Sequence, residues 1–418
     1  MRELFVYNPI MQMNETPSAN RVHIAFFGRR NTGKSSLLNA VTGQNLAVVS
    51  EVMGTTTDPV YKSMELLPLG PVVMIDTPGF DDTGELGEQR VLKAKQTLNK
   101  CHAAVLVLGE DSRMGGEVLL PDEKELVEIF KERKIPYVIV QNKCDLFYPE
   151  PSGVFYEETE ILPVSAKTGL NVNSLKQKIA EAAQSDEPEK RLAADLIQPL
   201  DLVVLVIPID KAAPKGRLIL PQQQVIRDIL EAGGQAVAVR EIELEKTLAG
   251  LGKKPALVIT DSQVFALVST IVPNDVPLTS FSILFARYKG FLETALRGVA
   301  ALETLQDGDK ILVCEGCTHH RQCDDIGTVK IPRWIKNHCE KEPDFIFFSG
   351  GDFPQDLSPY KLIIHCGACM LNEREMKYRR RHAENQNIPF TNYGITIAHT
   401  QGILKRSISM LNVTEEAQ

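Results

Sequence analysis

One segment constrains the fold of this chain more than any other: FFGRRNTGKSS, residues 26–36. Four residues separate Gly28 from the triplet Gly33-Lys34-Ser35, with an apolar run before the segment and the helix-like run LLNAVTG after it. This is the phosphate-binding loop in the strand–loop–helix context that it requires. Glycines let backbone N–H groups approach the phosphates, and the N-terminus of the following helix adds partial positive charge. The segment therefore predicts an α/β nucleotide-binding domain.

Three further motifs follow in the order typical of GTPases: DTPG (76–79), NKCD (142–145) and SAK (165–167). The Asp145 carboxylate can accept hydrogen bonds from two donors of guanine, and adenine presents no such pair. We therefore expect GTP, with Lys34 at the β- and γ-phosphates and Mg²⁺ bound by Ser35 and Asp76. The residues predicted to bind the nucleotide are Gly28, Asn31, Thr32, Gly33, Lys34, Ser35, Ser36, Asp76, Asn142, Lys143, Asp145, Ser165, Ala166 and Lys167.

The segment VMGTTTDPV (52–60) resembles the first switch of the tRNA-modification GTPase MnmE and its relatives. That resemblance implies that Thr56 binds Mg²⁺ and that Asn31 helps to bind K⁺, which would replace the positive charge of an arginine finger. Phe80 stands where many small GTPases have a glutamine that orients water, so we expect slow, potassium-stimulated hydrolysis. The predicted catalytic residues are Lys34, Thr56, Asp76 and Gly79.

Short apolar runs alternate with helix-like stretches along the chain, which is typical of parallel sheets covered by helices. The predicted fold class is α/β, a P-loop GTPase domain followed by two smaller α/β domains. We expect a single long helix over residues 282–307 and a helix that begins at Cys369. The predicted parts are a flexible N-terminal arm (1–20), the GTPase domain (21–185), a dimerisation domain (195–285) and a C-terminal α/β domain (290–418).

Six of the eight cysteines lie in the last quarter of the chain, which indicates one metal site there. Cys317-Thr318-His319 precedes His365-Cys366-Gly367-Ala368-Cys369, and 45 residues separate the two histidines. A CxH motif followed by HCxxC behind a GTPase domain resembles the HydF family of [FeFe]-hydrogenase maturation GTPases. The resemblance extends from about Val22 to the end of the chain.

The resemblance implies that Cys317, Cys366 and Cys369 hold a [4Fe–4S] cluster with one exchangeable iron, which makes residues 290–418 the iron–sulfur cluster-binding domain. His319 and His365 are candidates for its fourth ligand, or else hydrogen-bond donors beside it. It also implies a scaffold that receives a transient diiron precursor from radical-chemistry maturation enzymes and passes it to apo [FeFe]-hydrogenase. We expect this scaffold to be a homodimer.

Two other functions remain open on the sequence. Cys314-x-x-Cys317 and Cys366-x-x-Cys369 together form a pattern typical of structural zinc, although 48 residues separate the pairs. With zinc, the chain would be an RNA-associated GTPase of the MnmE or Era kind. A GTP-dependent redox enzyme is the second alternative. Cys314 ends an apolar run, so it is either a buried side chain or a further ligand.

Composition limits the partners. The net charge of -8 makes nucleic acid an unexpected partner, and no apolar run approaches the length of a membrane span. The N-terminus has no apolar core of a signal peptide, so we expect a cytoplasmic protein without membrane contact. The basic run 376–385 is either a solvated helix face or a docking patch for an acidic partner.

Overall fold

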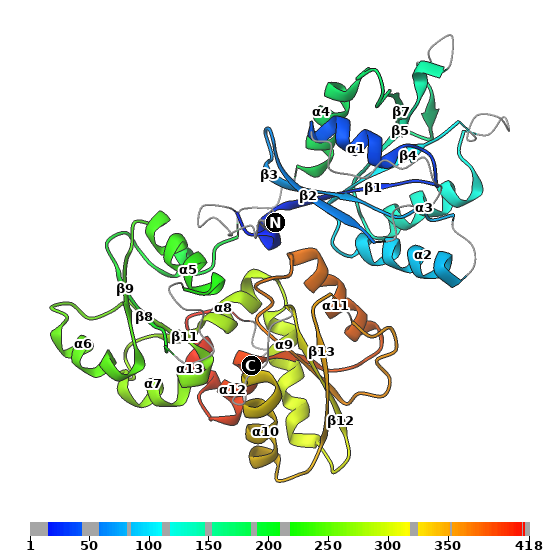
Figure 1. Cartoon of the computed structure of the whole chain (residues 1–418). Helices are drawn as coiled ribbons and strands as arrows, with labels where there is room; N and C mark the ends of the chain where they lie inside the picture. The colour runs from blue at the N-terminus through cyan, green and yellow to red at the C-terminus, as the bar shows by residue number, and fades with distance from the viewer. Residues whose placement is uncertain are drawn as a thin grey trace, which may run out of the picture. The chain divides into compact units, whose positions relative to one another are not determined.

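The computed structural model describes residues 16–43, 58–81, 85–110, 118–146, 153–184, 190–209, 218–317, 325–351, 353–411 and 413. The chain forms two compact units, Met1–Glu187 and Pro188–Gln418 (Figure 1). Most of the predicted N-terminal arm lies outside the described residues, and Ser18–Asn20 form a short 3₁₀ helix. No helix in the described part of the chain is both long enough and apolar enough to cross a lipid bilayer.

The first unit is built on a seven-stranded sheet with the order β2-β3-β1-β4-β5-β7-β6. Its strands are β1 (Val22–Phe27), β2 (Val60–Leu66), β3 (Gly70–Asp76), β4 (Ala103–Leu108), β5 (Tyr137–Gln141), β6 (Phe155–Tyr156) and β7 (Thr159–Pro163). Its helices are α1 (Lys34–Thr42), α2 (Glu85–Leu98), α3 (Pro121–Glu132) and α4 (Val172–Ala183). The outer strands β2 and β6 pair antiparallel with their neighbours, and the other pairs are parallel.

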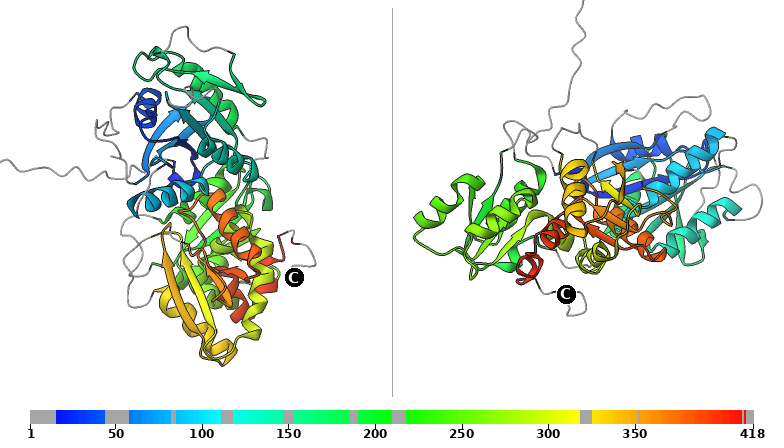
Figure 2. Two further views of the ribbon diagram at one scale, coloured as in Figure 1. Left: turned by 90° about the vertical axis from the view of Figure 1, so that its right-hand side faces the viewer. Right: turned by 90° about the horizontal axis from the view of Figure 1, so that it is seen from below.

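Helices cover both faces of this sheet, as Figures 1 and 2 show. Leu37 and Leu38 of α1 share one core with Leu175 of α4. Val127 and Phe130 of α3 belong to a second core on the opposite face. Burial on both faces explains why the inner strands are continuous apolar runs. Apolar and polar residues alternate in a strand when one of its faces meets water.

The second unit contains two four-stranded parallel sheets, with the orders β11-β10-β8-β9 and β13-β12-β14-β15. The first comprises β8 (Leu202–Val206), β9 (Gln235–Val239), β10 (Leu257–Thr260) and β11 (Leu278–Ser280). The second comprises β12 (Lys310–Glu315), β13 (Asp344–Ser349), β14 (Leu362–His365) and β15 (Phe390–Asn392). The predicted fold class, a P-loop GTPase domain followed by two α/β domains, is confirmed.

One continuous hydrophobic core joins the two sheets of the second unit, from Leu192 to Leu411. The helices around it are α5 (Leu220–Glu231), α6 (Leu244–Gly250), α7 (Phe265–Ile271), α8 (Phe281–Tyr288), α9 (Leu292–Val299), α10 (Ile331–Cys339), α11 (Glu373–Asn385), α12 (Tyr393–Thr400) and α13 (Leu404–Ile408). The ranges predicted as separate dimerisation and cluster domains each contain one sheet and pack together within this unit.

Two helix predictions were wrong. The expected helix over 282–307 is broken between α8 and α9, where Gly290 adopts a left-handed φ of 75° that ends α8. The helix that was predicted to begin at Cys369 is α11, and it begins four residues later, at Glu373. Its N-cap is Asn372, whose side chain accepts a hydrogen bond from the Glu375 N–H at 2.9 Å.

Gly298 of α9 provides a test of the contact between this helix and β15. A Cβ atom at Gly298 would lie 2.2 Å from the Phe390 carbonyl oxygen, and the three atoms nearest to it are all backbone atoms of Phe390. Alanine has a higher helix propensity than glycine, but the Phe390 backbone cannot move away from the added methyl group at low cost. We therefore expect Gly298→Ala to destabilise the second unit by roughly 1–3 kcal/mol. Urea unfolding followed by fluorescence of the single tryptophan, Trp334, would measure this.

Gly250→Ala is the matched control, because Gly250 also lies in a helix and no atom would meet its Cβ within 4 Å. We expect this variant to unfold at or above the wild-type urea midpoint. An unchanged midpoint for Gly298→Ala would contradict the packing described for α9.

Candidate functional site

The phosphate-binding loop approaches its neighbours so closely that only glycine fits at two positions. Gly28 has a φ of 156°, and a Cβ there would lie 2.4 Å from the Val107 carbonyl oxygen of β4. Gly33 has a φ of 82°, and its Cβ would lie 2.4 Å from the Asn142 side-chain nitrogen. These two glycines therefore allow the loop to lie against β4 and the NKCD motif at once.

The polar groups of the loop are held by each other and by the DTPG motif. Lys34 Nζ donates to the carbonyl oxygens of Gly28 and Arg29 at 2.9 and 2.7 Å. Ser35 Oγ donates to Asp76 Oδ2 at 2.5 Å. Both Lys34 and Asp76 are buried, so these polar groups have little access to water.

The Asp76 carboxylate has the properties of a cation ligand. Burial raises its pKa, although the hydrogen bond from Ser35 and the charge of Lys34 act in the opposite direction. Its Oδ1 atom is buried and has no hydrogen-bond partner among the described residues. A carboxylate oxygen beside a serine hydroxyl is the donor set that Mg²⁺ prefers. The residues at this position therefore fit the predicted magnesium ion.

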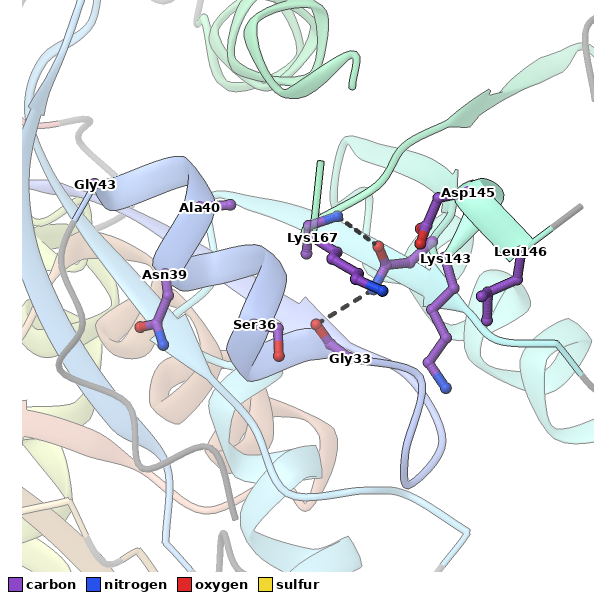
Figure 3. A pocket seen from close by; sticks show the side chains of 11 residues that line it. Gly33, Ser36, Asn39, Ala40, Gly43, Lys143, Asp145, Leu146 and Lys167 are labelled. Carbon is purple, nitrogen blue, oxygen red and sulfur yellow. Dashed lines mark hydrogen bonds between the residues drawn. The ribbon is translucent and has the colours of Figure 1, made fainter. Parts of the chain in front are cut away.

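A pocket of about 700 Å³ lies beside the loop (Figure 3). Ser36 and Asn39 of α1 line one side, and Lys143, Asp145 and Leu146 line the other. Its full lining is Gly33, Ser36, Asn39, Ala40, Gly43, Asn142, Lys143, Asp145, Leu146, Ala166 and Lys167. The structure thus brings the loop, the NKCD motif and the SAK motif to one cavity.

Hydrogen bonds between motifs orient the end of the pocket where a base would bind. Asn142 Nδ2 donates to the Thr32 carbonyl oxygen at 2.9 Å, and its Oδ1 accepts from the Ala166 N–H at 3.2 Å. Ser165 Oγ donates to Asp145 Oδ1 at 2.6 Å. The Asp145 carboxylate is therefore held in place by the SAK motif, with its second oxygen available for further hydrogen bonds.

The remaining predicted residues of this site lie at its edges. Asn31 is exposed, with a left-handed φ of 58° that asparagine tolerates. Thr56 lies outside the described residues. A Cβ at Gly79 would lie 2.7 Å from Arg30 Cγ, so the DTPG motif approaches the loop closely.

One contact in this region was missed by the sequence reasoning. The Arg30 N–H donates to Asp81 Oδ1 at 2.7 Å, and the Arg29 guanidinium lies 3.7 Å from Asp81 Oδ2. Asp81 therefore links the phosphate-binding loop to the segment after DTPG. The acidic residues that follow DTPG were the available signal.

The second site lies at the carboxyl ends of β12 and β14. These strands pair in parallel with Cys314 opposite His365, and the Cys366 N–H donates to the Cys314 carbonyl oxygen at 2.8 Å. Cys317 follows β12 by two residues, and Cys366 directly follows β14. The sheet therefore brings the two halves of the cysteine motif together, although 48 residues separate Cys317 from Cys366.

The thiols of this site are partly buried and close to one another. Burial raises the pKa of Cys317 to about 11 and that of Cys369 to about 12, and it also raises the pKa of Cys366. The neighbouring thiols make a smaller contribution to the raised pKa values of Cys317 and Cys369. Cys366 Sγ accepts backbone hydrogen bonds from Gly316 at 3.1 Å and Ala368 at 3.4 Å.

This arrangement fits a thiolate-bound metal centre. Three neighbouring thiolates in a desolvated place repel one another. Thiolate is the form that binds metal, and the positive charge of a bound metal offsets the repulsion. Backbone N–H groups that donate to a ligand sulfur are typical of iron–sulfur sites. The residues present therefore fit the cluster that the sequence predicts.

The other cysteines differ in their surroundings. Cys314 is completely buried within β12, and burial raises its pKa to about 12. Cys339 lies on α10 and is partly exposed. Cys323 and the predicted ligand His319 lie outside the described residues. A four-thiolate zinc site would need the Cys314 side chain, which belongs to the hydrophobic core of the second unit.

His365 is completely buried, and both of its ring nitrogens are engaged. Nδ1 lies 3.0 Å from the Cys366 carbonyl oxygen, so Nδ1 is the donor and Nε2 accepts from the Arg379 guanidinium at 3.1 Å. Burial and the Arg379 charge lower the His365 pKa to about 3. In this arrangement the imidazole is neutral and neither nitrogen is free to bind iron.

Arg379 belongs to the basic run 376–385, and the prediction of a solvated face is wrong at this position. Its side chain is completely buried over the Phe353 ring, with the guanidinium 5.1 Å from the ring centre. It donates to Glu375 Oε1 and to the Gly350 carbonyl oxygen, both at 3.0 Å. This buried charge is paired with Glu375, and its guanidinium donates to His365, which contacts the Cys366 carbonyl of the cysteine loop.

Lys289 is a second buried cation that the sequence reasoning missed. It lies at the end of α8, and its Nζ donates to the Leu371 carbonyl oxygen at 2.9 Å. Burial lowers its pKa to about 8, against the opposing charges of Glu373 and Cys369. Because it falls inside the run predicted as one helix, no sequence signal distinguished it.

Three family models match successive parts of the chain. A model described as a 50S ribosome-binding GTPase matches residues 23–143. The hydrogen maturase F dimerization domain matches 192–290, and the hydrogen maturase F tetramerization domain matches 293–410. The first contains the phosphate-binding loop and the DTPG motif and ends at Lys143, before Asp145 and the SAK motif. The third contains Cys317, Cys366 and Cys369.

Individual relatives resemble the GTPase part. The tRNA modification GTPase MnmE of Methylococcus capsulatus is 34% identical over 37% of this chain and 33% of its own length. MnmE of Acinetobacter baylyi is 31% identical over 37% of this chain and 32% of its own length. The chain thus spans about a third of these relatives. A crystal structure of Era with MgGDPNP and a segment of 16S ribosomal RNA has 21% identity, a TM-score of 0.35 and coverage of 52% of this chain and 91% of its own.

The Asp145 carboxylate provides a test of base recognition. Asp145→Asn keeps an oxygen that can accept from Ser165 but replaces the second acceptor with a donor. Because the donors of guanine lose their acceptor, we expect GTP affinity to fall about 100-fold. Xanthosine triphosphate, which has a carbonyl in place of the guanine amino group, should bind this variant more tightly than GTP does. Titration with fluorescent nucleotide analogues would measure both affinities.

The exposed Asp122 on α3 offers the matched control, and Asp122→Asn should leave both affinities unchanged. If Asp145→Asn bound GTP as tightly as the wild type, the role of Asp145 in base recognition would be wrong.

Proposed function

Because this chain belongs to the hydrogen maturase F family, we propose that it is a GTP-hydrolysing scaffold that delivers a diiron precursor to apo [FeFe]-hydrogenase. One observation supports the cluster part of this proposal most strongly. Cys317 and Cys366 follow the carboxyl ends of the paired strands β12 and β14, and Cys369 lies three residues after Cys366, while Cys314 is buried in the core. We infer that these three thiolates hold a [4Fe–4S] cluster.

The chemistry that this cluster supplies is an iron without a fourth thiolate, which can exchange its ligand. The cysteine loop supplies the three sulfurs, and the Gly316 and Ala368 N–H groups stabilise the Cys366 thiolate. Lys289 would offset part of the negative charge of the loaded site, since Cys369 already interacts with it.

The two histidines take different parts in this proposal. His365 holds the Cys366 carbonyl through Nδ1 and is held by Arg379 through Nε2, so we infer that it positions the loop. A role of His365 as fourth ligand would require one of these hydrogen bonds to break. His319 is then the better candidate for the exchangeable position.

For the nucleotide site, we propose that GTP binds in the pocket beside the phosphate-binding loop with Mg²⁺ on Ser35, Thr56 and Asp76. Lys34 would leave its loop carbonyl partners to bind the phosphates. Gly79 would donate its N–H to the γ-phosphate, and hydrolysis would remove this hydrogen bond. Asn31 would contribute to a K⁺ site that stabilises the transition state.

Two features bear on partners. The matched dimerization and tetramerization domains support a homo-oligomer. The proposed external partners are radical-chemistry maturation enzymes, which provide the diiron unit, and apo [FeFe]-hydrogenase, which receives it. A zinc-stabilised, RNA-associated GTPase is the competing proposal, and it is favoured only by the resemblance of residues 23–143 to ribosome-associated GTPases.

Anaerobic reconstitution with iron and sulfide tests the cluster. We expect about four irons per chain, brown colour and an EPR signal after reduction. Cys317→Ala, Cys366→Ala or Cys369→Ala should each lower the bound iron several-fold, because each removes a ligand. Cys339→Ala is the matched control, since Cys339 is also a partly exposed free thiol, and it should retain all the iron. A colourless protein with one tightly bound zinc would instead support the RNA-associated GTPase.

The cation dependence of hydrolysis is a separate test. We expect turnover in K⁺ to exceed turnover in Na⁺ on the order of tenfold, because a correctly sized cation adds positive charge in the transition state. Asn31→Ala should remove this difference while it leaves the rate in Na⁺ nearly unchanged. Phosphate release at equal ionic strength measures both rates. Equal wild-type rates in the two salts would contradict the role of Asn31.

A further inference from the structure

Three side chains of the second unit converge outside the two sites described above. Glu303 lies in the 3₁₀ helix Ala300–Thr304, His338 in the last turn of α10 and His399 in the last turn of α12. The helices α10 and α12 contact each other and lie side by side in Figure 1. Segments that are 35 and 61 residues apart in sequence therefore meet at one point.

The donor atoms of these side chains share one small volume. Glu303 Oε1 lies 2.8 Å from His338 Nε2 and 2.7 Å from His399 Nε2, and all three atoms lie within 4.8 Å of one another. The two imidazole rings have their centroids 5.3 Å apart at 65°. Both rings thus point the same nitrogen at the same oxygen.

We propose that Glu303, His338 and His399 bind a divalent transition-metal ion of the zinc type, independently of the cysteine site. Two imidazoles and one carboxylate form a common set of protein ligands for such ions. Zinc binds these donors at about 2.0–2.2 Å, so ligands of one tetrahedral ion lie about 3.3 Å apart. The two separations between Glu303 Oε1 and the histidine nitrogens need to lengthen by only about half an ångström to match that geometry.

The surroundings of the three residues allow this adjustment. The Glu303 side chain is 58% exposed and can rotate, whereas each histidine side chain is 24% exposed and lies on a helix. A water molecule can reach the fourth position, because the carboxylate faces solvent. Bound metal would tie the segment after α9 to the ends of α10 and α12.

A hydrogen-bonded tie without metal is the competing explanation, with each imidazole N–H donating to the carboxylate. Glu303→Gln separates the two. The glutamine amide keeps an oxygen that accepts from both rings, so a purely structural tie should survive. A neutral amide is a poor ligand for zinc, so metal affinity should fall at least tenfold.

The test uses the full-length chain with Cys317→Ser, Cys366→Ser and Cys369→Ser, so that the thiolates do not compete for metal. Titration with Co²⁺ should show one ion per chain, with visible absorption of a nitrogen–oxygen site and without intense thiolate charge-transfer bands. Zn²⁺ should displace the Co²⁺ and raise the thermal midpoint that Trp334 fluorescence reports, because a ligand bound only to the folded state stabilises it.

In this background, His338→Ala, His399→Ala and Glu303→Gln should each weaken Co²⁺ binding at least tenfold. His382→Ala is the matched control, because His382 is another half-buried histidine of the same unit and should leave binding unchanged. Absence of a stoichiometric Co²⁺ complex, or binding that survives Glu303→Gln and both histidine changes, would overturn the proposal. Glu303→Gln keeps the test valid if a histidine variant fails to fold.

Discussion

The parallel pairing of β12 with β14 is the interaction on which the cysteine site depends. It sets Cys314 opposite His365 and fixes the Cys366 N–H on the Cys314 carbonyl. Because both strands end at the same edge of the sheet, Cys317 and Cys366 lie at that edge together. The same geometric rule operates in the first unit, where the loops after β1, β3 and β5 supply the phosphate-binding loop, the DTPG motif and the NKCD motif.

Both sites depend on buried polar groups that are only partly paired within the protein. At the nucleotide site, Asp76 has one oxygen on Ser35 and the other without a partner in the described residues. At the cysteine site, thiols stand in a desolvated place that disfavours their charged forms. A buried anion without a counterion lowers stability, so a bound cation should stabilise each site.

Much of this could be predicted from sequence, because nucleotide motifs fix both residue type and spacing. The structure brings Gly33 of the phosphate-binding loop and Asp145 of the NKCD motif to one pocket. Arg379 was expected on an exposed helix face, either solvated or a docking patch, but it is completely buried. Helix periodicity does not reveal a buried acceptor such as His365. The break at Gly290 was missed, since both sides of it have apolar residues at helical spacing. Short strands such as Phe390–Asn392 have too few residues to show a period.

The hydrogen bonds of α8 bear on how the second unit behaves as a whole. Near its start, Ser282 accepts from the Asn392 side chain at 3.0 Å through its carbonyl and from the Gly394 N–H at 3.2 Å through its hydroxyl. Just after its end, Lys289 holds the Leu371 carbonyl, two residues after Cys369. The helix lies within the match to the dimerization domain, and its partners lie within the tetramerization domain. A displacement of α8 on oligomerisation would therefore have to break these bonds or move the cysteine loop with it.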